Sequence, residues 1–162
     1  MADKLFHMVG SLIFVVLAGG TFMVLIPARL LSWPHRLTFE TGVFRYVGLV
    51  PILVGLMVCL WCWRAFITRG GGTSAPYHPT EKLVVSGLYR FTRNPMYVGV
   101  IMVLLGEALF SDAALLFIYA GVVFLIFHAF VIVFEEPALR SRFGEAYERY
   151  CESVPRWLIR LK

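Results

Sequence analysis

Charged residues are scarce in this 162-residue chain, at 15%, whereas an ordinary soluble domain has about 25%. Hydrophobic residues reach 59%, the mean hydropathy is +0.77, and the apolar residues form long uninterrupted runs. This composition excludes an ordinary soluble domain and indicates helices that have lipid as their solvent. The net charge of +5 does not indicate a nucleic-acid partner, because the basic residues flank the apolar runs, where anionic lipid headgroups attract them.

Cysteine is also rare, with three residues in the chain. Cys59 and Cys62 form a C-x-x-C pair inside an apolar run, where a zinc or redox site would lack further ligands and a polar setting. We interpret both as small packing residues and predict no metal site. Cys151 is unpaired, which suits a reducing compartment.

The long apolar runs predict an all-α fold, a polytopic membrane helix bundle of about four transmembrane helices. The first run is too long for the core of a signal peptide, so we interpret it as a membrane helix. The four runs cover residues 5–30, 43–67, 95–110 and 113–134. Gly48 and Gly55 share one helix face, as do Gly99 and Gly106, and such smooth faces let another helix approach closely.

We predict a single membrane domain over residues 1–162, in which two cytoplasmic segments accompany the helices. The tail is predicted to be an amphipathic helix, because Leu139, Phe143, Tyr147 and Tyr150 recur at helical spacing. The four parts are an N-terminal helix pair (1–67), a cytoplasmic loop (68–94), a helical hairpin (95–134) and a cytoplasmic tail helix (135–162).

The distribution of basic residues predicts the topology. With four spans, the N-terminus, the 68–94 loop and the tail lie on one side, and together with Arg64 at the end of the second span they carry twelve of the fifteen Lys and Arg residues. The positive-inside rule therefore places both termini and this loop in the cytoplasm.

Two polar clusters are predicted to meet at that cytoplasmic surface. One precedes the third helix and contains Arg93, and the other follows the fourth helix and contains Glu135 and Glu136. Because Ser111-Asp112 turns the fourth helix back beside the third, the start of one and the end of the other must lie close together.

These clusters resemble the isoprenylcysteine carboxyl methyltransferase and phospholipid methyltransferase family of integral membrane enzymes. The family pattern is similar to G-x-Y-x-x-x-R-[HN]-P-x-Y-x-G, followed by a hydrophobic hairpin, E-E-x-x-L and F-G-x-x-Y-x-x-Y. The resemblance covers residues 84–157, and its matching residues are Gly87, Tyr89, Arg93, Asn94, Pro95, Tyr97, Gly99, Glu135, Glu136, Leu139, Phe143, Gly144, Tyr147 and Tyr150.

The resemblance implies S-adenosylmethionine as methyl donor and a lipophilic or membrane-embedded acceptor: an isoprenylcysteine carboxylate, a phospholipid amine or a small thiol. It implies catalytic roles for Arg93 and Glu136. The cofactor's carboxylate suits a guanidinium, for which Arg93 is the first candidate and Arg90 the second. The implied cofactor-binding residues are Ser86, Gly87, Tyr89, Arg90, Arg93, Asn94, Pro95, Tyr97, Glu135, Glu136 and Leu139.

Three features qualify this interpretation. No G-x-G-x-G follows a strand, which excludes a Rossmann cofactor site. Asn94 stands where many relatives carry histidine, and an amide does not titrate, so we predict no proton transfer there. His128 lies on the same helix face as Glu135, and three roles stay open for it: lining a substrate cavity, acting as a base, or packing with a hydrogen bond. Glu107 lies near the turn at Ser111-Asp112, where it can reach the far interface.

Two other functional classes stay open at this point. Membrane sterol reductases carry a somewhat similar R-H-x-N-Y-type stretch and use NADPH, but this chain is short for them and its E-E-x-x-L element favours methyl transfer. A non-enzymatic membrane scaffold would tolerate substitution of Arg93 and Glu136 but not of the glycine faces. Competition between cofactors separates the first alternative, and these substitutions separate the second.

Overall fold

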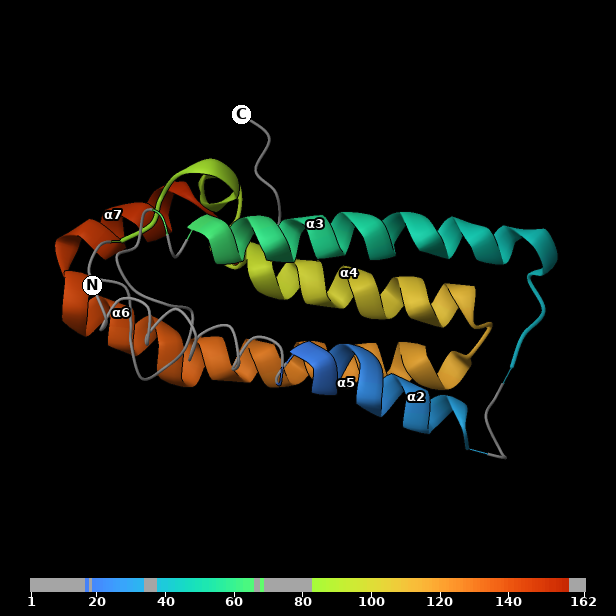
Figure 1. The fold of residues 1–162 in the computed structure, drawn as a ribbon. Coiled ribbons are helices and arrows are strands. Elements are labelled where there is room, and N and C mark those ends of the chain that lie inside the picture. Colours follow the sequence, from blue (N-terminus) through green and yellow to red (C-terminus); the bar gives the residue numbers. More distant parts are fainter. Residues whose placement is uncertain (1–16, 18, 34–37, 66–67, 69–82, 158–162) are drawn as a thin grey trace, which may run out of the picture.

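The computed structural model describes residues 17, 19–33, 38–65, 68 and 83–157, and their regular elements are all helical (Figure 1). This confirms the predicted all-α class. In chain order the elements are the π-turn η1 (Thr21–Leu25), α2 (Ile26–Leu31), the 3₁₀ segment η2 (Gly42–Gly48), α3 (Leu49–Ala65), the 3₁₀ turn η4 (Gly87–Arg90), α4 (Pro95–Phe110), α5 (Ala114–Phe130), the π-turn η5 (Val131–Glu135), α6 (Glu136–Phe143) and α7 (Glu145–Ser153).

Two continuous helices are long and apolar enough to cross a membrane. Gly42–Ala65 has 24 residues and a mean hydropathy of 2.2, and Ala114–Phe143 has 30 residues and a mean hydropathy of 2.7. In their most apolar windows only 11% and 22% of the residues are buried, so most of this apolar surface faces outward, as lipid contact requires.

The other two predicted spans are shorter in the structure. The described part of the first is Thr21–Leu31, and residues 1–16 and 18 lie outside the described residues. α4 begins at Pro95 and ends at Phe110, as predicted, and its 16 residues extend about 24 Å, less than the roughly 30 Å of a bilayer's hydrocarbon core. That all four cross the bilayer stays a prediction.

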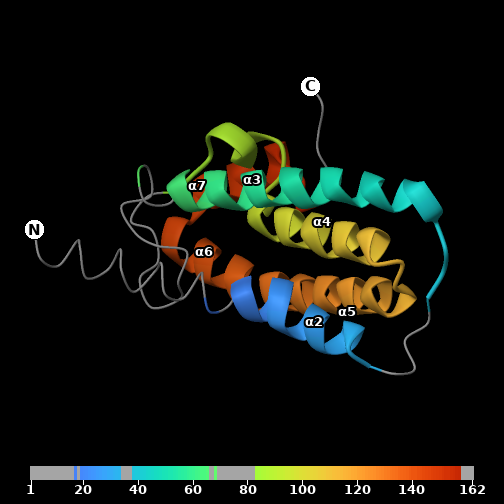
Figure 2. The same cartoon turned by 45° about the vertical axis from the view of Figure 1, so that its right-hand side comes forward.

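α3 and α4 lie side by side in both views of the ribbon (Figures 1 and 2). Glycines of η2 and α3 meet glycines of α4 along this contact. A Cβ atom on Gly48 would lie 2.5 Å from the carbonyl oxygen of Gly106, and one on Gly55 would lie 2.5 Å from that of Gly99. The two predicted glycine faces are therefore one contact, in which backbone meets backbone.

The predicted hairpin joins α4 to α5 through Ser111 and Asp112. Asp112 adopts a positive φ of 51°, and its side chain pairs with the Thr41 hydroxyl in the segment before η2. On the outer side of the hairpin, the Tyr119 hydroxyl donates to the carbonyl of Phe22 at 3.0 Å, so the first described helix packs against α5. α5 then runs back beside α4, toward the end of the bundle where α4 begins at Pro95.

The sequence predicted that the fourth helix ends near Phe134, but the helix is longer. It continues without interruption through η5 into α6, and the N–H of Glu136 donates to the carbonyl of Val131, five residues earlier. This wider turn lets the helix pass Pro137, which has no N–H to donate. Glu136 follows Ala114 by about 33 Å of helix, so a helix that enters the hydrocarbon core at Ala114 has left it at Glu136.

The predicted single tail helix over 135–162 is also corrected, because Gly144 divides it. Gly144 has φ 51° and ψ −131°, a conformation that side-chain-bearing residues rarely adopt, and it separates α6 from α7. The apolar tail residues still meet, because Tyr147 and Tyr150 pack with Leu139 and Phe143 in one cluster. Figure 1 shows α6 and α7 at the same end of the bundle as the start of α4. Residues 158–162 lie outside the described part.

Candidate functional site

Arg93 and Glu136 form an ion pair at this end of the bundle, which confirms the predicted proximity of the two polar clusters. Nη1 of Arg93 lies 3.1 Å from Oε1 of Glu136, and their side chains are 11% and 4% exposed. Arg93 precedes α4 and Glu136 opens α6, so the hairpin brings them together. Arg156 binds the same carboxylate with two hydrogen bonds, at 2.6 and 3.0 Å.

The charge around Glu136 is unbalanced. Arg140 lies 3.8 Å from it, so three guanidinium groups surround one carboxylate. Burial alone would raise the pKa of Glu136, but the hydrogen bonds from Arg156 and the charges of Arg93, Arg156 and Arg140 outweigh it and lower that pKa. Glu136 therefore stays ionised. Arg140 is also paired with Glu148, at 2.9 Å, so the three arginines and these two glutamates leave one positive charge in excess, which suits an anion.

Arg93 has one donor that no partner uses among the described residues. Its Nη1 also contacts Sγ of Cys151, at 2.8 Å, but its Nε is buried without a hydrogen bond. Because a buried donor without an acceptor is costly, this atom is a natural point of attachment for an acceptor group of a ligand.

Backbone hydrogen bonds tie the loop before α4 to the end of the tail. The N–H of Arg93 donates to the carbonyl of Pro155 at 2.9 Å. The Thr92 hydroxyl and the Asn94 amide both donate to the carbonyl of Arg156, at 3.0 and 3.2 Å. Asn94 is buried and donates its side-chain amide to the tail.

A cavity of about 70 Å³ lies beside the ion pair. It brings together six of the predicted cofactor-binding residues, Tyr89, Arg93, Asn94, Glu135, Glu136 and Leu139. Tyr97 reaches it indirectly, because its hydroxyl donates to Oε2 of Glu135 at 2.9 Å. Pro95 is the buried first residue of α4, which sets the direction of that helix.

Gly87 and Arg90 do not line this cavity. They line a separate open groove of about 480 Å³ between η4 and the C-terminal half of α3. Gly87 has a φ of +64°, and a Cβ atom there would lie 1.9 Å from the Trp61 indole, so glycine is required at this position. Ser86 directly precedes η4.

Sequence reasoning missed Arg156 and did not include Tyr147 and Tyr150 among the predicted cofactor-binding residues. Both tyrosines line the cavity, and the Tyr150 hydroxyl donates to the carbonyl of Tyr89 at 2.6 Å. The family pattern pointed to the tyrosines. Nothing in the spacing pointed to Arg156, which lies 20 residues after Glu136 and beyond the break at Gly144.

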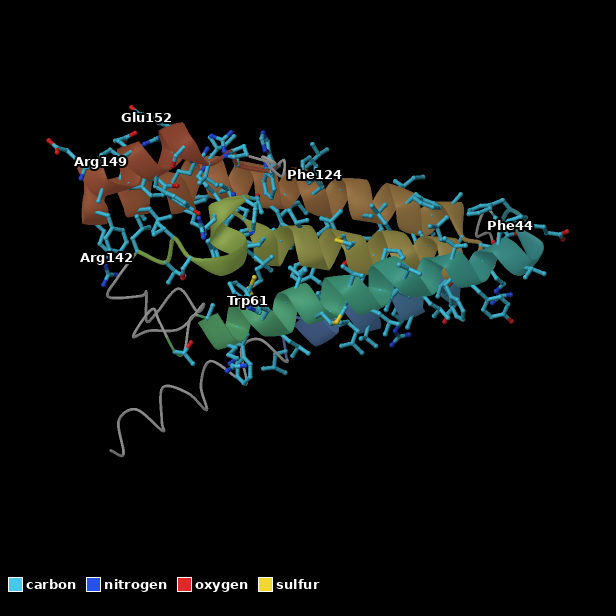
Figure 3. The ribbon with its side chains drawn as sticks, turned by 90° about the horizontal axis from the view of Figure 1, so that it is seen from above. Phe44, Trp61, Phe124, Arg142, Arg149 and Glu152 are labelled. Atoms are coloured by element: carbon cyan, nitrogen blue, oxygen red, sulfur yellow. The ribbon has the colours of Figure 1, made fainter. Side chains whose placement is uncertain are left out.

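His128 packs beside the site and does not line its cavity. Its Nδ1 accepts a hydrogen bond from Nε1 of Trp157 at 2.9 Å, and its ring stacks on Phe124. This geometry agrees with the hydrogen-bonded packing role among the alternatives. Figure 3 shows Phe124 on α5, while Arg149 and Glu152 point away from the bundle at the far end of the tail.

These helices and this buried charge cluster define a class of protein that sequence comparison identifies. Residues 43–146 match the model of the phospholipid methyltransferase family, so the chain belongs to that family of S-adenosylmethionine-dependent membrane methyltransferases. The match includes Arg93, Glu136 and the other residues that line the cavity, except Tyr147 and Tyr150.

Individual relatives agree with this assignment. Proteins described as "probable protein-S-isoprenylcysteine O-methyltransferase" from Oryza sativa subspecies indica and japonica are each 30% identical over 113 residues, which is 67% of this chain and 58% of theirs. The chain thus matches a little over half the length of these relatives. An uncharacterized protein of Haemophilus influenzae is 35% identical over 63 residues, covering 39% of this chain and 100% of its own length.

Proposed function

We propose that this chain transfers a methyl group from S-adenosylmethionine to a lipophilic acceptor held in the membrane. The observation that carries the proposal is the convergence of Arg93, Glu136 and Glu135 on one cavity at the end of the bundle where α4 begins and α6 begins. The family match supports the same reaction. With the proposed topology, this site opens to the cytoplasm, where the cofactor is dissolved.

The chemistry of the cavity residues fits the cofactor. The positive excess around Glu136 and the unused Nε of Arg93 suit its carboxylate. Glu135, which accepts from Tyr97 and forms no ion pair with the described residues, suits its amino group or ribose hydroxyls. The faces of Tyr89 and Tyr147 suit its cationic sulfur.

The cavity is smaller than the cofactor, because pockets for small molecules usually have about 300–1,000 Å³ and this one has about 70 Å³. Binding must therefore widen it. The element that we propose to move is the tail end around Pro155 and Arg156, which is held by the ion pair of Arg156 with Glu136, by hydrogen bonds to the loop before α4 and by the hydrogen bond of Trp157 to His128. Cofactor binding would then draw Arg156 away from Glu136.

When bound, S-adenosylmethionine supplies an electrophilic methyl group whose transfer removes the positive charge on sulfur. The chain contributes alignment and exclusion of water. Arg93 holds the carboxylate end, and Glu136 fixes the direction of its guanidinium. Tyr147, Tyr150 and Leu139 close the cavity against bulk water. A thiolate or carboxylate acceptor needs no base, whereas an ammonium must first lose a proton.

The proposed acceptor reaches the site from the bilayer, between helices. An isoprenylcysteine carboxylate, a phospholipid amine and a small lipophilic thiol all meet this description. The relatives from Oryza sativa carry the first of these in their descriptions.

Isothermal titration of the detergent-solubilised chain with S-adenosylhomocysteine tests the cofactor site. We expect binding that Arg93→Gln weakens about tenfold or more, because a charge-assisted hydrogen bond contributes about 1.5–3 kcal/mol. Arg149→Gln is the matched control, since that side chain is 70% exposed and lies outside the cavity. No binding at millimolar ligand would contradict the proposal. Weakening by Arg90→Gln but not by Arg93→Gln would move the carboxylate site to the groove.

A further inference from the structure

The groove between α3 and η4 is a second hollow whose lining has a different chemistry. The groove is lined from α3 by Val54, Met57, Val58 and Trp61. The segment that begins with η4 lines it with Gly87, Leu88, Arg90 and Phe91. All of these except Arg90 are apolar. Met57 is 60% exposed and Phe91 42% exposed, so the groove opens outward, away from the helix bundle.

One turn of 3₁₀ helix separates the groove from the cavity. Tyr89 points to the cavity, whereas its neighbours Leu88 and Arg90 line the groove. The turn is held firmly on both sides. Tyr150 binds the carbonyl of Tyr89, and Trp61 packs against Gly87 so closely that no side chain fits there.

The groove lies where a membrane lipid would lie. From Val54 to Trp61 it follows α3 for about 10 Å, within a helix whose apolar surface faces outward. Arg90 is the last residue of η4, which forms the other wall of the groove, and it is exposed. Arg90 forms no ion pair with the part of the chain that the structure describes. An apolar channel with a single cation at its polar end complements an acyl chain joined to an anionic headgroup.

We propose that this groove is a binding site for an anionic phospholipid, with one acyl chain along α3 and the phosphate on Arg90. Binding there requires no cofactor and no reaction, so the proposal goes beyond methyl transfer and stands or falls separately from it. The site would hold a lipid on the opposite side of η4 from the proposed cofactor cavity.

Quenching of Trp61 fluorescence tests the position of the lipid. The chain is reconstituted into phosphatidylcholine bilayers that contain, as a minor component, either phosphatidylglycerol or phosphatidylcholine with brominated acyl chains. Bromine quenches indole on contact, and the part of the quenching that disappears in Trp61→Phe belongs to Trp61. We expect the brominated phosphatidylglycerol to be about five times more effective, the preference that one arginine at a membrane surface confers.

Arg90→Gln should abolish this preference, and Arg64→Gln is the matched control. Arg64 is an exposed arginine at the same end of α3, but it does not line the groove. Equal quenching by the two brominated lipids in the unsubstituted chain would overturn the proposal, as would an equal loss of preference in both variants.

Native mass spectrometry gives a second measurement that does not depend on Trp61→Phe folding normally. The unsubstituted chain, released from mixed micelles of phosphatidylglycerol and phosphatidylcholine, should retain one phosphatidylglycerol that Arg90→Gln loses and Arg64→Gln keeps. Val58→Trp, which fills the groove with a larger side chain, should lose it as well. Retention of the lipid by both Arg90→Gln and Val58→Trp would place the lipid elsewhere.

Discussion

The two contacts that position α4 differ in kind. Along its length α4 meets α3 through glycine, where Gly99 and Gly106 bring their backbone against Gly55 and Gly48. At its start it meets the tail through charge, where Arg93 pairs with Glu136. The first contact is made by backbone, with Val58, Cys59 and Val103 beside it, and the second contains one carboxylate with three arginines around it.

This difference separates what holds the bundle from what equips the site. In lipid, apolar side chains gain nothing by leaving the solvent for a neighbouring helix, so close backbone approach has to hold α3 and α4 together. With the predicted spans, the hairpin leaves the hydrocarbon at the ion pair, where water and charge are available and a buried ionic cluster becomes possible. Perturbing each contact should therefore give a distinct response to substitution and to pH.

Glu136→Gln should have the largest effect, because it leaves Arg93 and Arg156 facing each other without a counter-charge. Removing one partner of a buried ion pair costs about 3–5 kcal/mol, and we expect a loss of about 3 kcal/mol since Arg156 is 30% exposed. Unfolding by sodium dodecyl sulfate in mixed micelles measures it. Glu145→Gln, at a 93% exposed side chain, is the control. A loss below 1 kcal/mol would show that the arginines find water or another anion.

Gly55→Ala should follow, because the added Cβ atom would lie 2.5 Å from the carbonyl oxygen of Gly99 and backbone cannot give way cheaply. Overpacking of this kind costs about 1–3 kcal/mol. Gly121→Ala is the matched control, since a Cβ atom there meets nothing within 4 Å, and alanine in a helix is favoured by about 0.5–1 kcal/mol. If both variants are stabilised, α3 and α4 are further apart than described.

Acidification should weaken the charged contact and spare the glycine contact. The folded state lowers the pKa of Glu136, so its stabilisation is present above the ordinary value of 4.5 and is lost as the pH falls below that value. The free energy of unfolding of the unsubstituted chain should therefore fall more steeply with acid than that of Glu136→Gln. Gly55→Ala should keep the steep dependence. Parallel pH profiles for the unsubstituted chain and Glu136→Gln would contradict this account.

Arg149→Gln should have the smallest effect. Its pair with Glu145 joins side chains that are 70% and 93% exposed, at 3.3 Å. Exposed pairs four residues apart on a helix contribute about 0.3–0.5 kcal/mol, and salt screens them. The same unfolding assay at low and high salt checks it, and a loss above about 1 kcal/mol would mean that the outer face of α7 contributes to the site.

Much of the fold followed from patterns that are local in the sequence. α4 spans the predicted residues because Pro95 opens it and Ser111-Asp112 ends it. The glycine faces were readable because residues seven apart share a side of a helix. Two departures from prediction each trace to one residue. Pro137 is accommodated by a π-turn inside a continuous helix, and Gly144 divides the tail through its positive φ.

For the site, the sequence by itself determined that Arg93 and Glu136 meet, because a tight hairpin between two helices of similar length leaves their other ends no alternative. Only the tertiary structure decided that Arg156 joins them, since the direction of α7 depends on the backbone angles of Gly144 and on packing. It also decided that Tyr89 and Arg90 serve different hollows. A 3₁₀ turn has three residues per turn, so neighbours in η4 point about 120° apart, and what each one meets depends on the helices around it.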